Sequence, residues 1–293
     1  MEFYPCDAAY AADAAACAAL FAHNVVLLPA ISNANLGQLT LDLVISTLLQ
    51  DGKTFMLAMS PNQGVELRKV GHLLSEAAPP IAGSAAFAKQ SPHDLCLNLE
   101  VYQSNEIKLT IIQQRAPVFP GRVHAFVKEF VEWAIKSKVS VLCAVGGYDD
   151  MLRHDHNMMS RPVRTICSFD PRKNSCLARF KNLTIGSDVG ETNGASSLSN
   201  NQWASVRGAG LAPLLYAQCG EQNLPFVAWL MSCAEGNNVP DAIAMTTQLF
   251  HILQIEMKTA TSMPDTMPPT LPLAIPPSWN QLFGRDPDVS LYL

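Results

Sequence analysis

The sequence has few charged residues and no concentration of positive charge. Of its 293 residues 15% are charged, 48% are hydrophobic, and the net charge is −5. Lys and Arg are scattered along the chain in runs of no more than two. Because a nucleic-acid-binding surface needs a basic stripe to displace counterions from phosphates, this composition argues against nucleic acid as a partner. So little surface charge favours a protein partner that covers part of the surface.

The sequence also lacks the signals of membrane insertion, secretion and disulfide formation. No window reaches the roughly twenty apolar residues of a membrane span. The Ala-rich stretch 8–21 is preceded by Glu2 and Asp7 rather than by Lys or Arg, which is unlike a signal peptide. The eight cysteines form no Cys-x-x-Cys pair, and Cys143 and Cys233 lie in apolar runs, as reduced core thiols do. We therefore expect a protein of the cytoplasm and nucleus without a membrane partner or a disulfide frame.

Catalytic motifs are sparse. The turn near Gly37 has one glycine where a dinucleotide-binding fingerprint needs three, and no Gly-x-Ser-x-Gly elbow occurs. Arg207–Gly210 (RGAG) is compatible with a backbone anion nest or with a tight turn. The best candidate cluster is YDDMLRHDH, which contains Asp149, His154 and His156. His-x-His on a strand would point both rings to one side, as a metal site requires, but this segment has a polar, loop-like context. We predict a solvated loop here, and an enzyme using these three residues remains the alternative.

The most informative stretch that is present runs from Asn24 to Gln50. It predicts a buried strand over Val25–Leu28, a break at Pro29, a polar turn, and a helix that opens near Gly37. The helix is apolar almost all the way round. Because such a strand and such a helix must both be covered on most sides, they indicate the centre of a layered α/β domain.

Hydrophobic periodicity predicts the other elements in turn. The predicted strands are Thr54–Met59, Val139–Val145 (ending at Gly146-Gly147) and Arg164–Phe169, with an antiparallel hairpin formed by Leu95–Tyr102 and Lys108–Gln113. The predicted helices are Arg122–Lys136, Leu224–Cys233 and Pro240–Met257. We predict one α/β domain over residues 1–258, with a flexible Gly/Ser/Asn-rich insertion at about 186–201. Residues 259–293 are predicted to form a Pro-rich linker and a tail.

Several segments resemble the proteasome assembly chaperone 2 (PAC2) family. The likeness begins in the Pro-Ala-Ile-Ser turn, the Gly-Gln-Leu that follows and the helix of the Asn24–Gln50 block. It recurs, in order, in Met1–Cys6, Val141–Pro171 (with Arg161-Pro162-Val163-Arg164), Val206–Cys219, Glu235–Ala242 (EGNNVPDA) and Ile275–Gly284 (IPPSWNQLFG). Together these segments extend over nearly the whole chain.

The resemblance implies a non-enzymatic assembly factor without a cofactor. Its fold would be a three-layer α/β/α sandwich with a mixed central sheet, similar to nucleoside phosphorylases but without their catalytic groups. It would form a heterodimer with proteasome assembly chaperone 1 and promote formation of the α-subunit ring of the 20S core particle. The C-terminal Leu291-Tyr292-Leu293 resembles the hydrophobic-Tyr-any signature of tails that dock between proteasome α-subunits. Such a tail offers a terminal carboxylate, an aromatic ring with a hydroxyl, and an apolar side chain.

Overall fold

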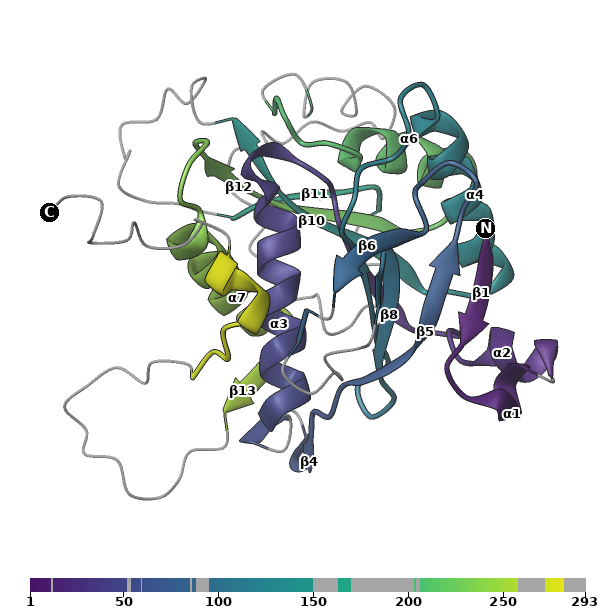
Figure 1. Ribbon diagram of the computed structural model, residues 1–293, viewed down its shortest axis with the longest axis horizontal. Helices are drawn as coiled ribbons and strands as arrows, with labels where there is room; N and C mark the ends of the chain where they lie inside the picture. The colour runs from purple at the N-terminus through teal and green to yellow at the C-terminus, as the bar shows by residue number, and fades with distance from the viewer. Residues whose placement is uncertain are drawn as a thin grey trace, which may run out of the picture.

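The order of the strands in the main sheet defines the architecture. A computed structural model of the chain describes residues 1–11, 13–51, 54–58, 60–84, 86–87, 95–149, 163–169, 203, 206–257 and 272–281. Across the main sheet the strands follow one another as β1 (Glu2–Pro5), β5 (Arg68–Leu74), β8 (Leu99–Ser104), β9 (Leu109–Gln114), β2 (Val25–Pro29), β10 (Val141–Asp149), β12 (Phe226–Cys233) and β11 (Val163–Cys167) (Figure 1). The pairs β9–β2, β2–β10 and β10–β12 are parallel, and the other neighbouring pairs are antiparallel. The sheet is therefore mixed, as predicted.

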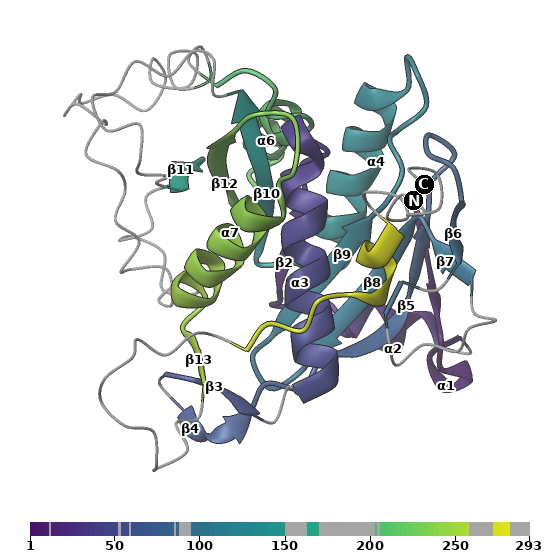
Figure 2. The same cartoon turned by 60° about the vertical axis from the view of Figure 1, so that its left-hand side comes forward.

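Helices cover both faces of this sheet. Figure 2 shows α3 (Leu36–Asp51) and α7 (Val239–Ile252) side by side on one face, with α4 (Val123–Lys136) and α6 (Ala212–Glu221) behind the sheet. Two separate clusters of buried apolar residues result, one between α3, α7 and the sheet and the other between α4, α6 and the sheet. This arrangement confirms the predicted α/β/α sandwich. The structure contains, within its described part, no helix with the length and apolarity that crossing a bilayer requires.

The block that begins the α/β core forms as its sequence predicts. All five residues of β2 are buried, and α3 starts one residue before Gly37. Within α3 the side chains of Leu36, Leu41, Val44 and Leu48 have no exposed surface. The helix is covered by the sheet, by α7 and by the chain around Trp279, which explains why its sequence is apolar almost all round.

Helix α4 and the β8–β9 hairpin also confirm their predictions. The hairpin pairs Leu99 with Gln114 and Ser104 with Leu109. The first residues of the predicted strand Leu95–Tyr102 behave differently, since β7 (Leu95–Leu97) pairs with β6 (Ile81–Ser84) in a separate two-stranded sheet. The predicted strand Thr54–Met59 contains β3 (Phe55–Leu57), which lies between β4 (Ser60–Gly64) and β13 (Ile255–Met257).

Three predicted boundaries or types are wrong. Leu224–Cys233 is not a helix, because Phe226–Cys233 forms strand β12 at the end of the parallel part of the sheet, between β10 and the antiparallel β11. Strand β10 does not end at the glycine pair but continues through it to Asp149. The predicted helix Pro240–Met257 ends at Ile252, and its last residues form β13.

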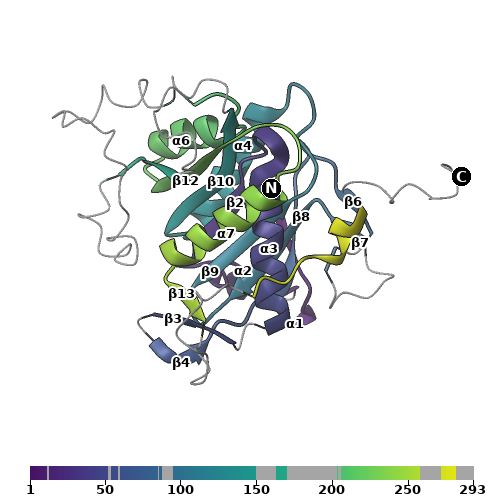
Figure 3. The ribbon, with the colours of Figure 1, turned by 90° about the vertical axis from the view of Figure 1, so that its left-hand side faces the viewer.

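The remaining elements are short. Near the N-terminus lie α1 (Ala8–Ala11) and α2 (Ala14–Ala19), and a 3-10 turn, η1 (Asn33–Asn35), joins β2 to α3. A second 3-10 turn, η5 (Pro277–Gln281), lies on the α3 face of the sheet (Figure 3). The insertion predicted at 186–201 falls outside the described residues. The predicted domain boundary after residue 258 stays a prediction.

Candidate functional site

The carboxyl ends of β2 and β10 form the first candidate site. In open α/β sheets, ligands bind in the crevice where adjacent parallel strands send their connections to opposite faces. Here β2 leads to α3 on one face, whereas β10 is followed along the chain by β11 and then by α6, on the other face, before β12. The β2–α3 turn, Ile31–Asn35, therefore occupies the position where a ligand would bind.

This turn is tied to the segments around it by hydrogen bonds. Asn33 N donates to the carbonyl oxygen of Gly208 at 2.8 Å, and Leu211 N donates to that of Ala30 at 2.6 Å. Gly147 N donates to Ser32 Oγ at 2.7 Å. These bonds join the ends of β2 and β10 to the Arg207–Gly210 segment, which is therefore a packed turn and not an open anion nest.

The Asn33 side chain and the turn backbone reach the end of β12 as well. Asn33 Nδ2 donates to the carbonyl oxygen of Cys233 at 2.8 Å, and Ala34 N donates to Glu235 Oε1 at 3.1 Å. Ile31, Ala34 and Asn35 have φ values of 47°, 58° and 52°, in the left-handed region that non-glycine residues rarely adopt. The surrounding bonds must hold this strained turn in place.

Glycines let the backbones around this crevice approach so closely that little room is left for a ligand. A Cβ atom on Gly37 would overlap the carbonyl oxygen of Val145, and one on Gly147 would overlap Cys233 Sγ. A Cβ atom on Gly210, whose φ is 59°, would overlap the carbonyl oxygens of Ala30 and Ile31. Backbone and small side chains thus fill the crevice, and the geometry favours a rigid joint over a ligand site.

The residues predicted for catalysis are divided between described and undescribed parts of the chain. Asp149 is the last residue of β10 and is partly exposed, and its backbone N–H donates to the carbonyl oxygen of Arg207 at 2.8 Å. His154 and His156 lie outside the described residues, as do the tail residues Leu291, Tyr292 and Leu293. Within the described ranges, no group of three or more His, Cys, Asp or Glu side chains is arranged to hold a metal ion.

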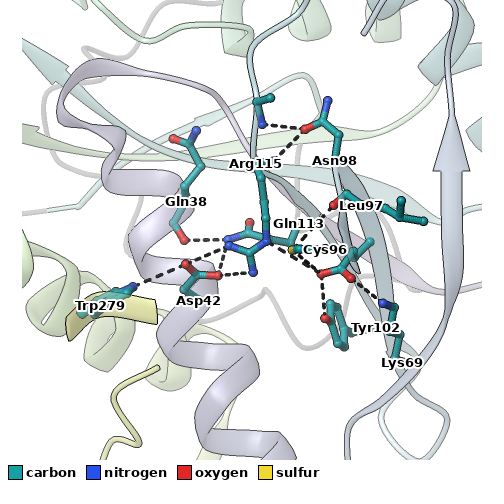
Figure 4. A network of polar contacts seen from close by, with 12 residues as sticks. Gln38, Asp42, Lys69, Cys96, Leu97, Asn98, Tyr102, Gln113, Arg115 and Trp279 are labelled. Atoms are coloured by element: carbon teal, nitrogen blue, oxygen red, sulfur yellow. Dashed lines mark hydrogen bonds and ion pairs between the residues drawn. The ribbon is translucent and has the colours of Figure 1, made fainter. Parts of the chain in front are cut away.

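A second candidate is a buried network of charged side chains on the α3 face of the sheet (Figure 4). Its centre is Arg115, just after β9, whose Nη2 lies 2.9 Å from Asp42 Oδ1 of α3 and whose Nε lies 3.8 Å from Glu100 Oε2 of β8. Lys69 of β5 forms the second ion pair of Glu100. The Glu100 side chain has no exposed surface, and Asp42 is 6% exposed. We call Asp42, Glu100, Arg115 and Lys69 the buried charge network.

Neutral groups complete the hydrogen bonding of the two carboxylates. Tyr102 Oη donates to Glu100 Oε2 at 3.0 Å, and Cys96 Sγ lies 3.3 Å from the same oxygen. Gln113 Nε2 donates to Asp42 Oδ1 at 2.7 Å. Buried charges of this kind are tolerated only when they are paired and hydrogen-bonded.

The pKa shifts in the network disfavour acid–base chemistry. Burial raises the pKa of the Cys96 thiol to about 12; Arg115 opposes the shift and Glu100 adds to it. Burial and then the Glu100 carboxylate raise the pKa of the Tyr102 phenol. Burial alone would lower the pKa of Arg115, but the charge of Asp42, its hydrogen bond to Arg115 and the charge of Glu100 act in the opposite direction, and the pKa is raised. Thiol and phenol thus stay protonated at neutral pH and serve as donors.

The network also holds a segment from near the C-terminus. Trp279 Nε1 lies 3.5 Å from Asp42 Oδ2, and the Trp279 side chain is 7% exposed (Figure 4). The sequence analysis did not predict the buried charge network or its contact with Trp279. The available signal was Asp42 itself, an acidic residue in an otherwise apolar helix, which requires a buried partner from elsewhere in the chain.

A surface hollow of about 550 Å³ lies away from both candidates, and its lining includes Glu2, Glu76 and Glu129. It opens near α4, on the opposite face of the sheet from the buried charge network. Glu129 in this lining is already partnered, because its Oε2 accepts from Ser75 Oγ at 2.7 Å and lies 3.8 Å from the Met1 ammonium.

Comparisons with known proteins give the family. A model of the PAC2 family matches residues 26–261. Proteasome assembly chaperone 2 of Danio rerio is 28% identical over 265 residues, covering 88% of this chain and 91% of that protein. Proteasome assembly chaperone 2 of Homo sapiens is 24% identical over 265 residues, with the same two coverages.

Solved structures support the same fold. A protein of unknown function from Thermoplasma acidophilum has a TM-score of 0.52 at 13% identity, over 83% of this chain and 81% of that one. Pyrococcus furiosus PbaA, described as an archaeal homolog of proteasome-assembly chaperone, has a TM-score of 0.50 at 12% identity, over 82% and 84%. At these identities the likeness concerns the fold alone. Since the family model extends over most of the chain, from the second residue of β2 to beyond β13, this protein belongs to the PAC2 family.

Proposed function

We propose that this protein is a proteasome assembly chaperone that acts by binding and not by catalysis. The observation that carries the proposal is the family match over residues 26–261, together with relatives named proteasome assembly chaperone 2 that align with 88% of the chain. In this proposal it forms a heterodimer with proteasome assembly chaperone 1, binds 20S α-subunits and promotes formation of their ring.

The proposed contact with the ring is the C-terminal Leu291-Tyr292-Leu293. The terminal carboxylate would pair with a basic side chain in a pocket between α-subunits. The Tyr292 ring and the Leu291 side chain would add apolar burial, and the phenol would add a hydrogen bond. These three residues lie outside the described ranges, so the proposal rests on their sequence.

A non-catalytic role is supported by the two candidate sites. The crevice at the ends of β2 and β10 is filled by the Ile31–Asn35 turn and the Arg207–Gly210 segment. The buried charge network offers protonated donors and paired carboxylates in place of a free base or nucleophile. The cysteines within the described ranges are free thiols, which supports the proposed cytoplasmic and nuclear location.

Affinity capture from extract of the source cells tests the proposal. The full chain should retain proteasome assembly chaperone 1 and 20S α-subunits in stoichiometric amounts. Deleting Tyr292-Leu293 should weaken binding to purified 20S core particles while leaving the heterodimer intact, and Ser290→Ala serves as the matched control. The alternative is a nucleoside-phosphorylase-like or amide-cleaving enzyme that uses Asp149, His154 and His156. It would be established by nucleoside turnover, or by a stoichiometric divalent metal, that is lost when any of these residues is replaced.

A further inference from the structure

The segment 272–281 packs on the folded core although it contains Pro272, Pro276 and Pro277 of the Pro-rich stretch. Figures 2 and 3 show it crossing α3 and ending in η5. Trp279 belongs to the buried apolar cluster on the α3 face, and Leu273 packs against the same cluster. Pro276, which lies between Leu273 and Trp279 in the sequence, is buried as well.

Two hydrogen bonds fix this segment to α3 at separate points. Ala274 N donates to Thr47 Oγ1 at 3.0 Å, and Trp279 Nε1 lies 3.5 Å from Asp42 Oδ2. Both acceptors are buried, with Thr47 1% and Asp42 6% exposed. Trp279 N also donates to the carbonyl oxygen of Pro276 at 3.0 Å, which closes the turn that presents the indole to α3.

The acceptor for the indole is itself rigidly held. Arg115 approaches both oxygens of Asp42, with Nη2 at 2.9 Å from Oδ1 and Nη1 at 3.3 Å from Oδ2. Gln113 of β9 donates to Oδ1 as well. Trp279 is therefore connected through Asp42 and Arg115 to the central sheet. The contact is part of the core and is not a loose surface association.

An anchor at 272–281 sets how many residues separate the folded core from the end of the sequence. Residues 282–293 number 12, whereas residues 258–293 number 36. Twelve residues span at most roughly 40 Å when fully extended. The effective concentration of a tethered group falls as about the −3/2 power of tether length, so a threefold shorter tether raises it about fivefold.

We propose that Trp279 and the segment 272–281 anchor the C-terminal tail on α3, so that Tyr292 is presented to the α-subunit ring from Gln281 on a 12-residue tether. The receiving pocket must then lie within roughly 40 Å of Gln281 when the domain is seated on the ring. Trp279 is a positioning residue in this scheme, since it acts through the tail. The inference rests on the proposed docking of Leu291–Leu293.

The test measures the affinity of the heterodimer for purified 20S core particles. Trp279→Ala releases the anchor and should weaken binding about fivefold in the intact chain. The same substitution should have no effect in a chain that lacks Tyr292-Leu293. Ile275→Ala is the matched control, because Ile275 lies in the same segment but is 55% exposed, and it should bind as the unaltered chain does.

A spacer variant tests the same inference without altering Trp279, so the result does not depend on whether Trp279→Ala folds. Inserting about 24 Gly/Ser residues after Gln281 leaves the anchor intact and lengthens an anchored tether threefold, which again predicts about fivefold weaker binding. If the tether instead began at residue 258, the same insertion would weaken binding only about twofold.

The outcomes separate this inference from the proposed function. A twofold effect of the spacer together with no effect of Trp279→Ala would overturn the anchor but leave tail docking in place. Unchanged ring binding after deletion of Tyr292-Leu293 would overturn tail docking itself, and the anchor's role would fall with it.

Discussion

At the scale of single residues, Arg115 determines whether the buried charge network is stable. It is the group that faces both Asp42 and Glu100, at 2.9 Å and 3.8 Å. Lys69 would remain beside Glu100 if Arg115 were absent, but Asp42 would then face the neutral side chains of Gln113 and Trp279. Removing one partner of a buried ion pair leaves an uncompensated charge in a low-dielectric environment.

Arg115→Leu should therefore destabilise the protein strongly. We expect the free energy of unfolding, measured by urea denaturation at pH 7, to fall by about 3–5 kcal/mol. Arg115→Lys is the matched control, because it keeps the positive charge but loses the two-pronged contact with Asp42. Its loss should be clearly smaller. Equal losses in both variants, or less than about 1 kcal/mol in Arg115→Leu, would mean that the pairing contributes little.

At the scale of elements, the close approach of α3 and β10 depends on a glycine. Gly37 is the second residue of α3, and a Cβ atom there would overlap the carbonyl oxygen of Val145 in β10. Gly220 is also helical, near the end of α6, but a Cβ atom there would meet nothing within 4 Å. Both glycines are helical, but a side chain has room at Gly220 and none at Gly37.

Alanine at these two positions should have opposite effects. An exposed helical Gly→Ala change ordinarily stabilises by about 0.5–1 kcal/mol, and Gly220→Ala should raise the melting temperature accordingly. Gly37→Ala must push α3 away from β10 and disturb the Ile31–Asn35 turn, so we expect a loss of about 2 kcal/mol or more. Thermal denaturation followed by circular dichroism measures both. A stabilised Gly37→Ala variant would show that the joint is not tightly packed.

Elements whose sequence mixes apolar and polar residues in a regular pattern could be predicted, and uniformly apolar ones were harder. The stripe of apolar residues in α4 identifies a helix correctly, and the alternation in β8 and β9 identifies a hairpin although both strands are fully buried. In β12 the first six residues, Phe226–Met231, are all apolar, so no polar position reveals a period that would separate a strand from a helix. The glycine pair in β10 reads locally as a strand end, but Gly146 and Gly147 are there because Ser32 and Cys233 pack against them.

At the scale of the whole molecule, the buried charge network could not be predicted. Its members come from α3, β5, β8 and the end of β9, and no spacing in the sequence connects Asp42 with Glu100, Arg115 or Lys69. Only the three-layer fold brings them together. The family resemblance, by contrast, depends on short contiguous motifs in a fixed order, which is why it could be recognised before the fold was known.

The extent of the folded unit is the remaining question at this scale. A boundary after residue 258 predicts that the domain is complete without the Pro-rich segment. The packing of Trp279 and Leu273 on α3 indicates instead that residues 272–281 contribute to the core on that face. Without them, part of an almost wholly apolar helix would be exposed to water.

Two truncated chains distinguish these possibilities. The chain 1–281 should keep the full free energy of unfolding to within about 0.5 kcal/mol, since it retains Trp279 and both hydrogen bonds to α3. The chain 1–258 should lose at least about 3 kcal/mol, the usual cost of removing a buried Trp side chain. Urea denaturation of both, beside the full-length chain, measures the difference. If 1–258 were as stable as the full chain, the segment would rest on α3 without contributing to folding, and the domain would end where its sequence first becomes rich in proline.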